Sequence, residues 1–206
     1  MSAPRIEFFF DLSSPWTRLA FANLWPLLER TGAQAVLRPI LVGGVFNAVN
    51  PAVYAAREDG QSRRMQHAWK VLGDWAKLAG VTMKFPSVYH PAKSVNAMRM
   101  ACALEDDQAA LRRFAEAAFE AYFGAQENLD DPDVLIAAAN AVGLDGVALA
   151  QASVTEANKL RLRANTDELI ARGGYGSPTL FVDGADMYFG NDQLPLVEFA
   201  LKGKAR

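Results

Sequence analysis

Two stretches decide the fold of this chain: Gly176-Ser177-Pro178-Thr179-Leu180-Phe181-Val182-Asp183-Gly184, close to the C-terminus, and Asp11-Leu12-Ser13-Ser14-Pro15-Trp16, close to the N-terminus. The first is a Gly-x-Pro step that runs into residues of high strand propensity. The second ends at Ser14-Pro15, where a helix can begin because serine is a favoured N-cap and proline suits the first helical position. Together they predict one site assembled from the two ends of the chain.

The first 41 residues predict a strand, a helix and a second strand. Residues 6–10 are apolar except for Glu7, which suits a central strand buried on both faces. Apolar residues then keep helical spacing until Gly32, and we expect Pro26 to kink or split this helix. Residues 35–41 predict the second strand, so the three elements form a parallel β-α-β unit.

The pattern changes at about residue 45 and stays helical to about residue 170. After this block, Thr179–Val182 and Met187–Phe189 flank Asp183-Gly184-Ala185-Asp186, which is a strong hairpin signal. Asn191-Asp192 is expected to cap a last helix. We therefore predict an α/β fold with a large all-helical insertion between the second and third strands.

The composition favours chemistry on small molecules. Lys and Arg number 21 against 23 Asp and Glu, and the charges are scattered, so neither a nucleic-acid nor a membrane surface is indicated. We find no signal peptide or spanning segment and expect a cytoplasmic protein. Two histidines and one cysteine are too few for a zinc site, so we predict no metal. Cys102 lies in a helical pattern, where a buried, inert thiol is the favoured interpretation.

Ser14 is the candidate catalytic residue. A hydroxyl at a helix N-terminus, backed by unpaired N–H groups and the helix dipole, stabilises an anion beside it. If that anion is the thiolate of a bound thiol cofactor, a pKa lowered by ~2 units corresponds to roughly 2.7 kcal/mol. The alternative is that Ser14 only caps the helix, and the Ser177-Pro178 step weighs against that alternative.

Pro178 is placed where a cis peptide bond would open the backbone of Ser177 to an incoming peptide. A glutathione-like tripeptide could then add as a short extra strand, although an ordinary turn proline fits the same position. Asn191 and Asp192 offer a helix start and a carboxylate suited to the α-amino group of a γ-glutamyl moiety. A plain N-cap explains these two residues equally well.

These residues resemble those of the 2-hydroxychromene-2-carboxylate isomerases and the related kappa-class glutathione transferases, thioredoxin-like proteins related to the DsbA fold. The resemblance covers nearly the whole chain. It rests on four stretches: Phe8-Phe9-Phe10-Asp11-Leu12-Ser13-Ser14-Pro15, Arg38-Pro39-Ile40-Leu41-Val42-Gly43-Gly44-Val45-Phe46, Gly176-Ser177-Pro178-Thr179 with Val182-Asp183-Gly184, and Phe189-Gly190-Asn191-Asp192.

The resemblance implies a thioredoxin-like domain of residues 1–44 and 171–206, an inserted helical subdomain of residues 45–170, and a homodimer. A helical face carrying Met98, Met100 and Phe119 is where we look for the dimer interface.

The resemblance also implies reduced glutathione as cofactor. Ser14 would hydrogen-bond its sulfur, and Ser177, beside Pro178, would hold the cysteinyl unit by its backbone. Asn191 and Asp192 would bind the γ-glutamyl end, and Asn50 would also contact the cofactor.

The function that the resemblance implies is a glutathione-dependent isomerase acting on an aromatic hydroxychromene-carboxylate-type substrate. The isomerisation would proceed by reversible thiolate addition, bond rotation and elimination. A kappa-like transferase that conjugates electrophiles is the first alternative, and a non-catalytic peptide-binding module is the second. A disulfide oxidoreductase is disfavoured, because Ser14 and Thr17 stand where the cysteine pair of such a site would be. The chain departs from the family pattern at Arg18, Asn47 and Gln193.

Overall fold

The computed structural model describes residues 3–54 and 62–204. Its sheet has four strands in the order β2-β1-β3-β4: β1 (Arg5–Phe10), β2 (Gln34–Pro39), β3 (Thr179–Val182) and β4 (Asp186–Phe189). β1 pairs in parallel with β2 and antiparallel with β3, and β3 and β4 form the expected hairpin. The predicted β-α-β unit and hairpin are thus confirmed. They place the C-terminal end of β1 beside the start of β3.

Helix α1 (Pro15–Thr31) connects β1 to β2 and begins as predicted. Ser14 is its N-cap, and Gly32 closes it with a left-handed φ of 67° that glycine adopts without strain. The helix continues through Pro26, so the expected split is wrong. Leu24 and Leu27 beside this proline are buried, and their packing outweighs one lost backbone hydrogen bond.

Between β2 and β3 the described chain is helical, as predicted. A π-helical turn, Glu120–Gly124, extends α6, and a 3-10 turn, Asn191–Gln193, precedes the last helix. The α-helices after β2 are α2 (Val42–Val49), α4 (Arg63–Ala79), α5 (Val95–Ala103), α6 (Gln108–Phe119), α7 (Pro132–Ala141), α8 (Gly146–Ser153), α9 (Glu156–Ala171) and, after β4, α10 (Leu194–Lys204). The division of the chain into domains at residues 44 and 171 stays a prediction.

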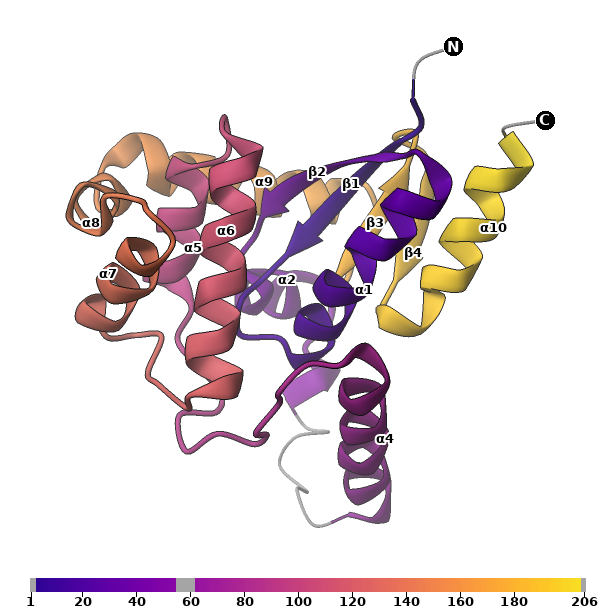
Figure 1. The fold of residues 1–206 in the computed structure, drawn as a ribbon, viewed down its shortest axis with the longest axis horizontal. Coiled ribbons are helices and arrows are strands. Elements are labelled where there is room, and N and C mark those ends of the chain that lie inside the picture. Colours follow the sequence, from indigo (N-terminus) through magenta and orange to yellow (C-terminus); the bar gives the residue numbers. More distant parts are fainter. Residues whose placement is uncertain (1–2, 55–61, 205–206) are drawn as a thin grey trace.

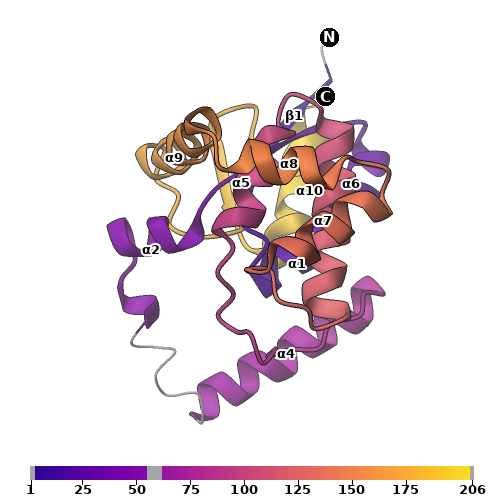
Figure 2. The same cartoon turned by 90° about the vertical axis from the view of Figure 1, so that its left-hand side faces the viewer.

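The sheet is covered on both faces. Helices α5 to α8 gather beside the β2 edge, while α1 and α10 lie across one face (Figure 1). Helices α2 and α9 contribute Val45 and Leu169 to a second cluster with Phe9 and Phe181 on the other face. Helix α4 lies along one end, away from the α7–α8 pair (Figure 2). Because Phe8 and Phe10 face one layer and Phe9 the other, the apolar run of β1 is explained by a sheet buried on both sides.

Met98, Met100 and Phe119 lie inside this core. Each is at most 1% exposed, so the expectation that they mark a dimer interface is wrong. Helical spacing alone does not distinguish a face that packs within the chain from one that packs on a partner. None of the helices in the described ranges is both long and apolar enough to cross a bilayer.

Candidate active site at the start of helix α1

The Ser14 hydroxyl links the two stretches that decide the fold. As the N-cap of α1, its Oγ accepts a hydrogen bond from the Thr17 N–H at 3.2 Å. The same hydroxyl donates to the Ser177 carbonyl oxygen at 3.1 Å. The Ser14 side chain is half-buried, so it keeps access to solvent. A hydroxyl at a helix N-terminus that also reaches solvent is well placed to meet an anion.

Ser177 is fixed from behind by two further hydrogen bonds. Its Oγ accepts from the Asp11 N–H at 2.9 Å and lies 2.7 Å from Thr17 Oγ1. The Ser177–Pro178 peptide bond is cis. Within the described residues nothing accepts a hydrogen bond from the Ser177 N–H, which leaves this backbone amide for an added peptide segment.

Asp11 is a fully buried carboxylate that holds the turn together. Its Oδ1 accepts from the Ser13 N–H and the Ser13 hydroxyl, at 2.9 and 2.8 Å, and its Oδ2 accepts from the Val42 N–H at 2.8 Å. Burial raises the pKa of Asp11, and these hydrogen bonds only partly offset that effect. The sequence analysis did not single out Asp11. The Asp-x-Ser spacing after a strand, which is typical of an Asx turn, was the signal that could have found it.

Asn50, at the end of α2, also reaches this site. Its Nδ2 donates to the Tyr175 carbonyl oxygen at 3.2 Å, two residues before Ser177. Between them, Gly176 is required, because a Cβ there would lie 2.7 Å from the Phe189 ring. The structure therefore brings Ser14, Ser177 and Asn50 around one short segment of backbone.

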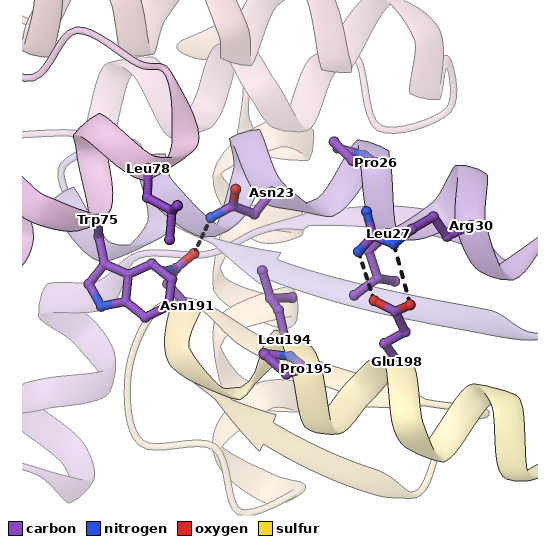
Figure 3. A pocket seen from close by; sticks show the side chains of 10 residues that line it. All are labelled: Asn23, Pro26, Leu27, Arg30, Trp75, Leu78, Asn191, Leu194, Pro195 and Glu198. Carbon is purple, nitrogen blue, oxygen red and sulfur yellow. Dashed lines mark hydrogen bonds and ion pairs between the residues drawn. The ribbon is translucent and has the colours of Figure 1, made fainter.

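Asn191 is close by in the backbone, but its side chain points elsewhere. The Gly190 N–H donates to the Pro178 carbonyl oxygen at 3.1 Å, which places this segment beside the cis peptide bond. Asn191 Oδ1 accepts from Asn23 Nδ2 at 2.8 Å, inside a pocket of about 200 Å³ between α1, α4 and α10 (Figure 3). Asn23 lies nine residues after Ser14, about 13 Å along α1 at 1.5 Å per residue.

Neither residue caps the last helix in the expected way. The N-cap of the 3-10 turn is Gly190, which has no side chain to act as a cap, and the Asn191 side-chain oxygen accepts from Asn23 instead. Asn191 is 1% exposed and its Nδ2 finds no partner among the described residues. Asp192 is exposed, and its Oδ1 would lie 2.7 Å from a Cβ at position 190, so the carboxylate folds back over Gly190.

The three departures from the family pattern have partners within this chain. Arg18, on the first turns of α1, is buried and pairs with Glu120 at 3.2 Å. Asn47 Oδ1 accepts from the Tyr54 hydroxyl at 2.9 Å, and Gln193 Oε1 accepts from the Phe189 N–H at 2.8 Å. Each substituted side chain is thus used to hold local structure.

Cys102 lies outside this site. It is fully buried on α5, and burial raises the pKa of its thiol to about 12. A thiol in that state is neither a nucleophile nor an exchange partner at neutral pH. The residues at the start of α1 therefore offer hydroxyls and backbone groups in place of thiol chemistry.

Comparisons with known proteins agree with the fold. The family described as the DSBA-like thioredoxin domain matches residues 5–202. A 2-hydroxychromene-2-carboxylate isomerase of Sphingobium xenophagum is 29% identical over 198 residues, which cover 94% of this chain and 95% of the relative. Glutathione S-transferase kappa 1 of Rattus norvegicus is 28% identical over 218 residues, which cover 98% and 93%. The solved structure of a 2-hydroxychromene-2-carboxylate isomerase matches with a TM-score of 0.77 and 26% identity, over 98% of this chain and 96% of that one.

Proposed function

The chain belongs to the DSBA-like thioredoxin domain family, and from this premise we propose that it is a glutathione-dependent isomerase. Its substrate would be an aromatic, hydroxychromene-carboxylate-type compound. Relatives named as an isomerase and as a glutathione transferase support an enzyme of this kind. The observation that carries the proposal is the Ser14 hydroxyl, which lies at the N-terminus of α1 against the Ser177 carbonyl oxygen.

The residues present fit a glutathione cysteinyl unit. The Ser177 N–H, without a partner in the described chain, can donate to its carbonyl group. Ser14 has one hydroxyl proton and now shares it with the Ser177 carbonyl oxygen. If the cysteinyl N–H donates to the Ser177 carbonyl oxygen in place of Ser14, the Ser14 hydroxyl proton can turn toward the sulfur. Peptide binding and thiol activation would then be linked through one carbonyl oxygen.

The two ends of the cofactor would meet different groups. We assign the γ-glutamyl end to the Gly190–Asp192 segment, where the exposed Asp192 carboxylate can accept from an α-amino group. Asn191 would support this segment from beneath, through its bond to Asn23. Asn50 already holds the Tyr175 carbonyl oxygen through its Nδ2, and its amide oxygen would be the acceptor that it offers to the cofactor.

When bound, glutathione would supply a thiolate that adds to a conjugated double bond and leaves again after rotation about it. The chain's part is to hold that sulfur as an anion. Ser14 donates a hydrogen bond to it, and the first turn of α1 adds its dipole. Together the hydroxyl and the dipole would have to stabilise the thiolate by roughly 2.7 kcal/mol, which corresponds to lowering the thiol pKa by ~2 units. Asp11 acts through others, because it orients Ser13 and the start of α2.

A pair of matched serine variants tests the proposal. Ser14→Ala removes the hydroxyl at the site, while Ser62→Ala removes an equivalent N-cap from α4, where Ser62 Oγ accepts from the Met65 N–H. Calorimetry should show that wild type and Ser62→Ala bind reduced glutathione. An assay of isomerase turnover should show that Ser14→Ala is slower than wild type by a factor of about 100 or more. Unchanged turnover in Ser14→Ala would contradict the assigned role.

The second candidate is a kappa-like transferase that conjugates electrophiles, which the similarity to the rat protein favours. Product analysis separates the two activities. An isomerase returns free glutathione after each turnover, whereas a transferase consumes it and leaves a stable thioether. If wild type binds no glutathione at all, a non-catalytic peptide-binding module becomes the better explanation.

A further inference from the structure

A second pocket, which we call the seam pocket, lies between helices α2, α5 and α9. It has a volume of about 360 Å³ and is lined by residues of α2, α5 and α9. Figure 2 shows how these three helices are arranged. None of its lining residues belongs to the Ser14 site. The volume lies at the lower end of the range for small-molecule pockets.

The walls of this seam pocket are aliphatic. Leu162, Thr166 and Ile170 lie at spacings of four on α9 and therefore share one face of that helix. Leu41 and Val95 face them from the starts of α2 and α5. Thr166 adds no free polar group, because its hydroxyl donates to the Leu162 carbonyl oxygen and accepts from the Leu41 N–H.

The charges around the seam pocket are mostly positive, and the Glu156 carboxylate among them interacts electrostatically with both Lys159 and Arg99. Lys159 bonds Glu156 at 2.7 Å, and Arg163 lies 3.7 Å from Asp167. Arg99, which follows Val95 by one turn of α5, makes no hydrogen bond or ion pair within the described residues. Its Nε is buried without a partner. The Arg99 side chain as a whole is half-buried and lines the pocket, so its guanidinium group can meet an anion there.

We propose that the seam pocket binds a small aliphatic carboxylate, with its headgroup on Arg99 and its chain among Leu41, Leu162 and Ile170. The apolar walls disfavour a strongly hydrated anion, and the positive charge of Arg99 favours a ligand with an anionic headgroup over a neutral hydrocarbon. This inference does not rest on the proposed glutathione chemistry, because none of the atoms that carry it belong to Ser14 or Ser177.

Calorimetry with hexanoate, octanoate and 1-octanol tests this assignment on the full chain. Octanoate should bind more tightly than 1-octanol. It should also exceed hexanoate by roughly fifteenfold, since each buried methylene contributes a factor of about four. Arg99→Gln should weaken octanoate at least tenfold and leave 1-octanol unchanged. Arg113→Gln, an exposed arginine on α6, is the matched control and should change neither.

Two further variants keep the test decisive. Ala48→Phe places a large side chain in the pocket from α2 and keeps Arg99, so it should abolish octanoate binding, with the fold checked by circular dichroism. Ser14→Ala should leave octanoate affinity unchanged. The proposal is overturned if wild type does not bind octanoate, if Arg99→Gln binds it as well as wild type, or if Ser14→Ala removes the binding.

Discussion

The start of α1 and the C-terminal end of α5 carry two side chains of similar size, Ser14 and Cys102, that differ in their capacity for chemistry. Ser14 is half-buried, stands at a helix N-terminus and is held by two polar partners. Cys102 is intrinsically the better nucleophile, yet it is fully buried, and its pKa is raised to about 12. The comparison teaches that exposure and oriented dipoles, more than the identity of the atom, decide where this chain can do chemistry.

The largest expected effect comes from moving a thiol into the site. In Ser14→Cys, the helix N-terminus and solvent access should lower the thiol pKa, so labelling by a disulfide reagent at pH 7 should be at least about 100-fold faster than in wild type. The rate should be the same in Ser14→Cys combined with Cys102→Ala. Labelling of Ser14→Cys as slow as that of Cys102 would remove the contrast between the two regions.

The sequence predicts this contrast in part. Ser14, Ser177 and Asn50 could be found because a Ser-Pro turn, a Gly-x-Pro step and a family resemblance mark them locally. Asp11 and the Asn23–Asn191 bond were missed, because their partners are fixed only by tertiary packing. The Asn191 and Asn23 side chains meet across 168 positions of sequence, and no local pattern specifies such a bond. The same limit explains the wrong interface assignment for Met98 and Met100.

A smaller but measurable effect is expected at Asp11. In Asp11→Asn the new NH₂ group would face the Val42 N–H, so we expect a loss of about 1–3 kcal/mol in the free energy of unfolding. Asp192→Asn, at an exposed carboxylate, should change it by less than about 0.5 kcal/mol. Urea unfolding measures both values. Equal stability of the two variants would show that Asp11 does not hold the turn.

The pH dependence of this loss has a definite sign. The pKa of Asp11 is raised in the folded state above 3.8, so ionisation costs stability as pH rises through that value and onward to the raised pKa. The advantage of wild type over Asp11→Asn should therefore be largest at low pH and shrink across this window. An advantage that grows as pH rises from 3.8 would contradict the raised pKa.

The smallest effect is expected in α5. Cys102→Ala should leave glutathione binding and turnover unchanged, because the thiol lies outside the site, and should lower the free energy of unfolding by about 1 kcal/mol through lost packing. Calorimetry and urea unfolding check the two parts. A loss of turnover without a loss of stability would mean that Cys102, and not Ser14, carries the chemistry.

The central claim is that the Ser14 hydroxyl holds a bound thiol as its anion. The direct measurement is the ultraviolet absorbance of the thiolate of bound reduced glutathione as a function of pH, in wild type and in Ser14→Ala. The account predicts a pKa lowered by ~2 units in wild type and a much smaller shift in the variant. Identical titration curves for the two proteins, or a wild-type curve that matches free glutathione, would contradict it.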